Sequence, residues 1–319
     1  MSSLTVGIAG ISGKFALLLA SCLLERDPKI KIKGLARSPS KVPKALSSAQ
    51  NLELIQGDAF EVDNIRQFVR GCSVIVCCYL GDDHLMIDGQ KLLIDIAEEQ
   101  NVPRYVASDW STDWTKLEMG ALFSKEPCQR IKAYLDTKTA IKGVHILVGG
   151  FTDVIFAPFF GIYDSKSFTF SYWGTGDEKW ECTTYANSAE YTAAVCLDQS
   201  AAGLTILTVV GDVKSTLEIS QIFQKAYHIK PNLVGHGSLA ELHTRMIEER
   251  GKYGADFYKY VFYWYHYFQL SGKSFMGPKY DNEMYPEITP VTIEDYMRQT
   301  KPGSLGGASF AWEKRTEKN

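Results

Sequence analysis

Short apolar runs alternate with longer amphipathic stretches along the first half of the chain. Runs rich in β-branched residues predict strands, and apolar positions three or four residues apart predict helices. The expected strands are 5–9, 29–36, 52–56, 73–78, 104–108 and 145–148, and the expected helices are 14–26, 62–70, 86–100 and 128–137. Strands that alternate with helices at this spacing indicate an α/β fold with a doubly wound parallel sheet.

The pattern changes in the second half. Two strand-like runs, 168–173 and 179–182, flank the turn Gly174-Thr175-Gly176 and predict a hairpin. Further expected elements are a helix from Ser188, a strand over 205–210, helices over 216–227 and 238–250, and a last helix begun by Thr292 as N-cap with Asp295 as N3. We expect three parts: a sheet domain over 1–150, a smaller α+β domain over 151–300 that is interleaved with it, and a flexible or peripheral tail over 301–319.

Composition restricts the function classes. The chain has 319 residues and a formal net charge of −3, so no overall positive field favours nucleic acid or an anionic membrane as a partner. We expect neither a secretory signal nor a membrane span, because no basic and apolar leader and no apolar run of about 18 residues is present. The seven cysteines are odd in number and lack Cys-x-x-Cys spacing, which favours a reducing, cytoplasmic location and no metal site.

The most informative motif is VGIAGISGKFA, in which a strand-like run passes through glycines into an apolar helix. Two registers are open, one with Gly7, Gly10 and Gly13 and one with Gly10, Gly13 and Ala16. We prefer the second because it leaves a strand of about five residues before the turn. Gly10 then permits the turn, and Gly13 lets N–H groups at the helix N-terminus approach the pyrophosphate of a dinucleotide. The residues expected beside that pyrophosphate are Ser12, Lys14 and Phe15.

The end of the second strand, GLARSPSK, bears on cofactor choice. An NAD site has an acidic residue here, whereas this chain has Arg37, Ser38 and Lys41. A guanidinium and a hydroxyl suit a 2′-phosphate, which favours NADPH or NADP⁺; a solvated basic loop is the plainer alternative. Asp58 and Ala59, after the third strand, are expected near the adenine, although an acidic turn residue would explain Asp58 equally well.

Ligands of doubly wound sheets bind outside the carboxyl ends of the strands. The expected contacts of the ribose and nicotinamide at these ends are Cys78, Tyr79, Leu80, Ser108, Gly149, Gly150 and Phe151. Asp109 and Trp110 are expected at the substrate. Ordinary packing of strand ends is the alternative for the residues that follow the fourth and sixth strands.

Tyr134 and Lys138 match the Tyr-x-x-x-Lys pair of ordinary short-chain dehydrogenases. Lys138 lies shortly before the sixth strand, so the pair is expected at the end of its helix that faces away from the carboxyl edge of the sheet. We therefore exclude the pair from the site. Lys125 and Cys128, at the start of the same helix, are better placed.

Seven segments carry a resemblance to a known family: GIAGISGKFA, GLARSPSK, NVPRYVASDW, LFSKEP, VHILVGGF, SFTFSYWGTGDEKWECTTYANSAEYTAAV and PEITPVTIEDYMRQ. Together they resemble the NmrA-like and isoflavone-reductase-like branch of atypical short-chain dehydrogenases, especially its fungal members, over nearly the whole chain. The resemblance implies an NADP(H)-binding Rossmann domain, a smaller carboxy-terminal substrate domain and one catalytic lysine near the nicotinamide. The fungal Lys-acidic-Pro pattern selects Lys125 as that lysine, whereas counting back from VHILV in the plant pattern selects Cys128. A cysteine at that position would argue against reduction.

Residues 257–268, FYKYVFYWYHYF, include nine Phe, Tyr and Trp residues in twelve positions. One face of such a helix is expected to pack on the body of the protein, and the other to line an apolar, aromatic pocket. The substrate contacts expected there, besides Cys128, are Phe156, Phe160, Tyr263 and His266. Core packing is the alternative for most of them.

Three functional hypotheses follow. The first is an NADPH-dependent reductase of a small apolar or aromatic ketone or enone in fungal secondary metabolism, in which Lys125 assists the carbonyl oxygen as the hydride arrives. The second is an NADP(H)-sensing regulator without turnover, as in NmrA-like proteins. The third is an isomerase or cyclase whose chemistry is not net redox. The sequence leaves monomer and homodimer open.

Overall fold

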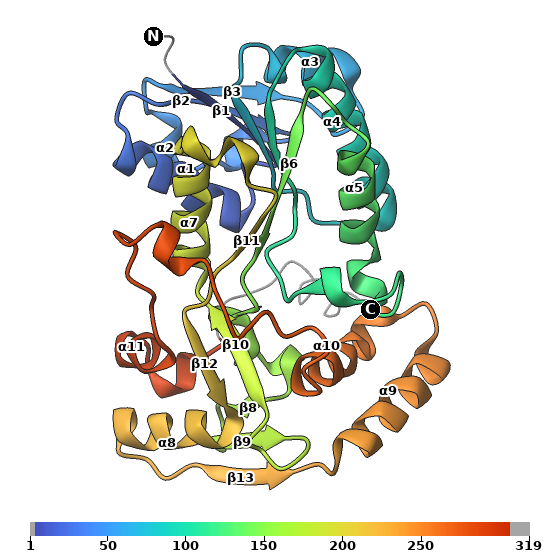
Figure 1. The fold of residues 1–319 in the computed structure, drawn as a ribbon. Helices are drawn as coiled ribbons and strands as arrows, with labels where there is room; N and C mark the ends of the chain where they lie inside the picture. The colour runs from blue at the N-terminus through green and yellow to red at the C-terminus, as the bar shows by residue number, and fades with distance from the viewer. Residues whose placement is uncertain (1–3, 307–319) are drawn as a thin grey trace.

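The computed structural model describes residues 4–306, and their centre is a seven-stranded sheet (Figure 1). All neighbouring strands of this sheet are parallel. From one edge to the other they are β11 (Ile206–Thr208), β6 (Lys142–Leu147), β5 (Arg104–Val106), β4 (Val74–Cys77), β1 (Thr5–Ala9), β2 (Lys31–Ala36) and β3 (Leu52–Gln56). The strand order reverses beside β1, between β4 and β2, which confirms the doubly wound fold.

Helices cover both faces of the sheet. Helices α1 and α7 share one apolar core with it, and α3, α4 and α5 share the other. The helices around the sheet are α1 (Lys14–Arg26), α2 (Lys44–Ser47), α3 (Val62–Val69), α4 (Gln90–Glu99), α5 (Glu126–Asp136) and α7 (Tyr185–Leu197). The helix predicted over 86–100 is divided, because His84–Gly89 forms a π-helical turn before α4.

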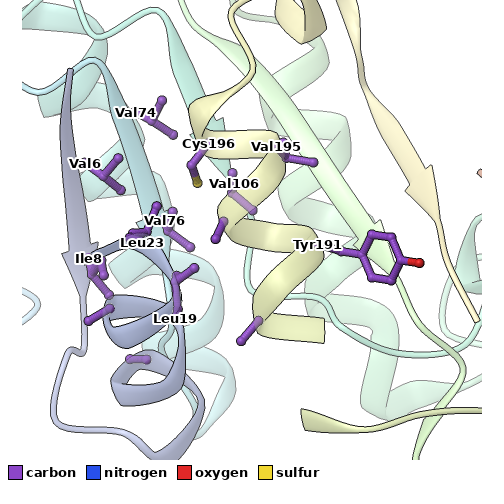
Figure 2. Packing of buried hydrophobic residues seen from close by; sticks show 14 of the residues in the cluster. Val6, Ile8, Leu19, Leu23, Val74, Val76, Val106, Tyr191, Val195 and Cys196 are labelled. Carbon is purple, nitrogen blue, oxygen red and sulfur yellow. The ribbon is translucent and has the colours of Figure 1, made fainter. Parts of the chain in front are cut away.

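Apolar side chains on alternate strand positions hold α1 against the sheet. Figure 2 shows Val6 and Ile8 of β1 beside Leu19 and Leu23 of α1. All four side chains are fully buried, and burial of each contributes about 1.5–3 kcal/mol. Because this packing holds α1 against β1, it also fixes the position of the turn that connects them.

The second body is built on two small sheets, with strand orders β12-β10-β7 and β13-β9-β8. Its strands are β7 (Gly150–Phe151), β8 (Tyr163–Asp164), β9 (Thr169–Tyr172), β10 (Lys179–Thr183), β12 (Asp212–Ser215) and β13 (Asn232–Gly235). Its helices are α6 (Thr152–Ile155), α8 (Thr216–Tyr227), α9 (Leu239–Tyr253), α10 (Val261–Leu270) and α11 (Ile293–Gln299). Helix α7 and strand β11, which come from the second half of the chain, complete the large sheet domain (Figure 1).

The predicted hairpin is wrong, although both of its strands exist. Strand β9 pairs with β8 and β13, whereas β10 pairs with β12 and β7. The connection between them is closed by the Glu178 carboxylate, which accepts the N–H groups of Thr175 and Gly176 at 3.0 and 2.9 Å. The local pattern therefore predicted two strands correctly and their pairing incorrectly.

The last helix begins as predicted, with a reciprocal capping box between Thr292 and Asp295. Beyond it, the described part of the tail packs on the protein: Leu305 is 3% exposed, and the Tyr163 hydroxyl donates to the Pro302 carbonyl at 3.1 Å. The rest of the predicted tail, 307–319, lies outside the described residues. Over residues 4–306, none of the helices combines the length and the apolarity that crossing a membrane requires.

Candidate functional site

The turn between β1 and α1 has the geometry of an anion site. Gly10 has a φ of +80°, and a Cβ there would lie 2.9 Å from the carbonyl oxygen of Cys78. Helix α1 has Gly13 as its N-cap and, among the described residues, neither a capping side chain nor an acidic residue in its first turn. Its N-terminal dipole and N–H groups therefore favour a bound anion. Gly7 lies within β1, so this is the arrangement that the second register predicts.

The ends of β2 and β3 place the other predicted dinucleotide residues along the same edge. Arg37 follows β2 directly, and both Arg37 and Lys41 are exposed, while Ser38 between them is half-buried. Asp58 follows β3, and its carboxylate accepts the N–H of Phe60 at 3.2 Å. Asp58 therefore has the turn role that the plainer alternative assigned to it, and the neighbouring Ala59 is buried.

The ends of β4 and β5 are tied together at this edge. The Ser108 hydroxyl donates to the Tyr79 carbonyl oxygen at 2.7 Å. The Tyr79 hydroxyl is buried and has no hydrogen-bond partner within residues 4–306, which is rare in native proteins. Cys78 is half-buried, and Leu80 is 70% exposed. A polar ligand that lies across this edge would supply the missing partner of Tyr79 and cover Leu80.

An aromatic group stands beside the N-terminus of α1. The rings of Phe15 and Trp110 are 4.1 Å apart, and Phe151 stacks on Tyr185 at 4.0 Å. Lys14 lies 4.6 Å above the Tyr185 ring. The expected substrate residue Trp110 is 8% exposed and donates its indole N–H to Thr192 of α7 at 2.9 Å. Trp110 therefore packs between α1 and α7. Its φ of +31° is a strained backbone conformation of the kind found near functional sites.

Gly149 and Gly150 stand where the chain leaves the large sheet. Gly149 has a φ of +69°, and a Cβ there would overlap the carbonyl oxygen of Glu181. Gly150 begins β7 and pairs with Cys182 of β10. Gly149 therefore allows the chain after β6 to approach β10 closely, whereas a Cβ at Gly150 would lie at an ordinary contact distance of 3.7 Å from the Glu181 oxygen.

Lys125 lies where a short 3₁₀ turn, Phe123–Lys125, leads into α5. It is half-buried, and its ammonium nitrogen is 5.7 Å from the centre of the Tyr265 ring on α10. Burial lowers the pKa of Lys125, but Tyr265, Cys128 and Asp109 together outweigh burial and raise the pKa above its ordinary value. Lys125 is therefore an ammonium ion at neutral pH.

Cys128 lies one turn after Lys125 and is 4% exposed. Burial raises the pKa of the Cys128 thiol strongly, the Asp109 carboxylate raises it further, and Lys125 opposes both. The side chain therefore remains a thiol, and its sulfur lies 4.0 Å from the Ser108 carbonyl oxygen. Of the two residues that the sequence left open, Lys125 is the charged and more accessible one.

Behind these residues lies a buried pair that the sequence did not reveal. Asp109 Oδ2 and His145 Nδ1 are 2.6 Å apart, and their side chains are 1% and 2% exposed. The Trp114 ring packs edge-on against His145 at 5.5 Å. Asp109 was expected at the substrate, but its side chain is enclosed in the protein. The only signal in the sequence was a histidine within the apolar run VHILV.

The carboxy-terminal aromatic residues divide into core and surface. Phe156 is 1% exposed and packs against Tyr163, Phe170 and Tyr296. His266 is 4% exposed, lies 2.8 Å from the Phe160 carbonyl oxygen, and has a pKa lowered to about 4 by burial. Phe156 and His266 are therefore core residues rather than pocket-lining residues, and Phe160 is largely buried beside them.

Five half-buried rings form what we call the aromatic surface. They are Phe159, Trp173, Phe262, Tyr263 and Tyr265. Phe262 links Phe159 to Tyr263 through ring contacts at 6.0 and 4.1 Å, and Tyr263 contacts Trp173 at 6.5 Å. Through Tyr265 this surface reaches Lys125.

The Tyr134 and Lys138 pair is engaged elsewhere, as predicted. The Tyr134 hydroxyl donates to Asp95 of α4 at 2.5 Å, and Lys138 forms ion pairs with Asp95 and Glu98 at 2.6 and 3.1 Å. These contacts lie at the end of α5 opposite to Lys125. The pair therefore stabilises the packing of α5 on α4.

Residues 10–144 match the family model for NAD(P)H-binding domains. This part of the chain is an NAD(P)H-binding domain. Its uncapped helix N-terminus, the close approach at Gly10 and the unpartnered Tyr79 hydroxyl all fit such a cofactor. Comparison with curated protein sequences gives no match.

Several solved structures are similar to this chain. Isoflavone reductase has a TM-score of 0.75 at 16% identity, over 93% of this chain and 99% of that one. AtPrR2 with NADP⁺ and (+)pinoresinol has a TM-score of 0.74 at 16% identity, over 94% and 99%. Leucoanthocyanidin reductase from Vitis vinifera, in a binary complex with NADPH, has a TM-score of 0.74 at 14% identity, over 92% and 98%. At these identities the likeness establishes the fold, which is the one that the sequence resemblance implied.

Proposed function

We propose that this protein is an NADPH-dependent reductase of a small apolar or aromatic ketone or enone. The observation that carries the proposal is the Lys125 ammonium, which belongs to the NAD(P)H-binding domain, lies 5.7 Å from the Tyr265 ring of the aromatic surface and has a raised pKa. The complexes of similar structures with NADP⁺ and (+)pinoresinol, and with NADPH, support it. On the sequence resemblance and the cysteine pattern, we assign the reaction to the cytoplasm and to fungal secondary metabolism.

The nicotinamide, when bound, supplies the hydride chemistry. Lys125 would bind the carbonyl oxygen and stabilise the negative charge that develops there, an effect worth about 3 kcal/mol where water is excluded. The aromatic surface would hold the apolar part of the substrate and keep water away. Arg37, Ser38 and Lys41 would bind the 2′-phosphate through charge-assisted hydrogen bonds.

Cofactor choice is tested by calorimetric titration with NADPH, NADP⁺ and NADH. We expect NADPH to bind more than about tenfold tighter than NADH, a difference of about 1.4 kcal/mol. Arg37→Ala should weaken NADPH binding by about 10- to 100-fold, since a hydrogen bond to a charged group contributes about 1.5–3 kcal/mol, and should leave NADH unchanged. Lys44→Ala, at an exposed lysine of α2, is the control. Equal weakening of both cofactors by Arg37→Ala would contradict the assignment.

Turnover is tested by following NADPH oxidation with a panel of aromatic ketones and enones. Lys125→Met should lower kcat by about 10²-fold or more, whereas Lys132→Met, on the solvent side of α5 in an ion pair with Asp136, should not. Equal affinity for NADPH and NADP⁺ without turnover of any compound would favour the sensing role over the reductase.

A further inference from the structure

We propose that the Tyr265 hydroxyl is the proton donor of the reaction and that Lys125 acts beside it as the charged partner. This inference rests on the proposed reductase function and adds a catalytic residue to it. The sequence suggested a tyrosine and lysine pair on one helix, at Tyr134 and Lys138. The fold assembles a different pair from two elements far apart in the chain.

The two side chains meet between the two bodies of the protein. Lys125 comes from the start of α5 in the sheet domain, and Tyr265 comes from the middle of α10. The lysine nitrogen lies 5.7 Å from the centre of the tyrosine ring, and Tyr265 is the first of the groups that raise the pKa of Lys125. Both residues are half-buried, so a substrate on the aromatic surface can reach them.

Buried contacts within the turn that follows Tyr265 fix its helix. His266 is held by the Phe160 carbonyl at 2.8 Å. Gln269, which shares a face of α10 with Tyr265 by the i and i+4 spacing, accepts a hydrogen bond from Thr112 at 2.9 Å and donates to Glu181 at 3.4 Å. Because these anchors lie within one turn of Tyr265, the position of the phenol is set by the core.

The ring of Tyr265 is also supported directly. It stacks on Phe160 at 6.0 Å with an interplanar angle of 22°. A tyrosine ring has two side-chain torsions and the lysine chain has four, so the phenol is the more rigidly positioned donor. The other titratable groups near the pair are Cys128 and Asp109 on the side of Lys125; His266, on α10 itself, is bonded to Phe160 instead.

The chemistry of the pair suits ketone reduction. An ammonium ion beside a phenol stabilises the negative charge that develops on the phenol oxygen while its proton is transferred. The carbonyl carbon accepts a hydride from the reduced nicotinamide, the π electrons of the C=O bond move to oxygen, and that oxygen takes the Tyr265 proton. The products are an alcohol and the oxidised nicotinamide, and a proton from water restores the phenol. Lys125 keeps its proton throughout.

The neighbouring rings indicate the substrate class. Tyr265 is joined to the rest of the aromatic surface through Phe160, which contacts both Tyr265 and Phe159 at 6.0 Å, and Phe159 contacts Phe262. A carbonyl that reaches Tyr265 would have its adjacent substituent on these rings. We therefore assign the site to aryl ketones, whose ring can pack on the aromatic surface.

The contact is tested on the cofactor-free protein by NMR of [ε-¹³C]lysine, with the Lys125 signal identified by its loss in Lys125→Met. At pH 10 we expect the wild-type Lys125 signal at the ammonium position and a shift toward the amine position in Tyr265→Phe. Tyr267→Phe removes a hydroxyl from the same helix, one that accepts a hydrogen bond from Lys273, and should leave the Lys125 signal in place. An unshifted Lys125 signal in Tyr265→Phe would overturn the proposal, and this readout requires no substrate.

Measurements of turnover and of NADPH binding distinguish the role proposed for Tyr265 from the reductase function on which that role rests. Tyr265→Phe should lower kcat for aryl ketones by about 10²-fold or more with unchanged NADPH affinity. Tyr267→Phe, which removes a hydroxyl of α10 that accepts a hydrogen bond from Lys273, should retain kcat. Retention of kcat by Tyr265→Phe together with its loss in Lys125→Met would overturn the role of Tyr265 and leave the reductase intact. Failure of the wild-type protein to bind NADPH would instead overturn the reductase, while the lysine signal would still report on the contact.

Discussion

Replacement of Asp109 by asparagine tests the buried pair behind Lys125. Asp109 and His145 are 2.6 Å apart with side chains 1% and 2% exposed, so water does not screen their interaction. A hydrogen bond to a charged group contributes about 1.5–3 kcal/mol, and asparagine keeps the shape but not the charge. We therefore expect the free energy of unfolding to fall by about 2 kcal/mol. For 319 residues, an unfolding entropy of about 2.1 cal/mol/K per residue converts this loss to a Tm lower by about 3 °C.

The assay is thermal denaturation at neutral pH, followed by circular dichroism. Asp95→Asn is the matched control, because Asp95 also accepts a bond at 2.6 Å, from Lys138, but its side chain is 47% exposed. Exposed ion pairs contribute less than about 1 kcal/mol, so the control should shift the Tm by less than about 1.5 °C. Equal shifts in the two variants would refute the argument that burial makes the Asp109 pair important. The same asparagine variant should lower the pKa of Lys125, since the Asp109 charge raises it.

Three further predictions follow from the structure. Burial lowers the pKa of His266 to about 4, whereas the ordinary value in the unfolded chain is about 6.5. The unfolded state therefore binds the proton at a higher pH than the folded state. As a consequence, the free energy of unfolding falls as the pH drops from about 6.5 to about 4. His266→Gln should flatten this part of the curve of Tm against pH, and an unchanged slope would contradict the assignment. Gly10→Ala places a Cβ 2.9 Å from the Cys78 oxygen at a φ of +80°. The substitution should lower the free energy of unfolding by about 1–2 kcal/mol, measured by thermal denaturation, and weaken NADPH binding, measured by calorimetry. Wild-type stability and wild-type affinity in this variant would contradict the anion site. Tyr134→Phe combined with Lys138→Ala should keep turnover within about twofold of wild type, and a tenfold loss would return that pair to the active site.

Local patterns predicted most elements of the sheet domain, but not α2 or the π-helical turn before α4. The bounds of β1 (Thr5–Ala9), α1 (Lys14–Arg26) and β3 (Leu52–Gln56) agree with the sequence prediction, because each apolar run ends at a glycine, a charge or a cap. The pairing of β9 and β10 did not follow from the sequence. Both strands carry a buried aromatic residue, Phe170 and Trp180, and a local pattern cannot show that each pairs with strands distant in the chain.

Some residues of the candidate site could also be predicted from the sequence, and others could not. The dinucleotide residues lie at strand ends, so the topology of a parallel sheet was enough to place Gly10 and Arg37 on one edge. His145 and Tyr265 could not be placed by this rule. His145 faces Asp109 only because β5 and β6 are adjacent, and Tyr265 meets Lys125 only through the packing of α10.

Glu181 connects the segment that follows α10 to the small sheet that begins directly after β6. Its carboxylate is fully buried and accepts the N–H groups of Met276 and Gly277 at 2.7 and 2.8 Å and the Tyr280 hydroxyl at 2.8 Å. A buried charge requires such a set of donors, and here the donors come from the segment that follows α10. Glu181 belongs to β10, which pairs with β7 directly after the end of β6. The carboxyl edge of the sheet and the segment that follows α10 are therefore connected through the hydrogen bonds of one buried carboxylate. This connection limits movement of the helix that carries the proposed proton donor, as proton transfer to a fixed carbonyl requires.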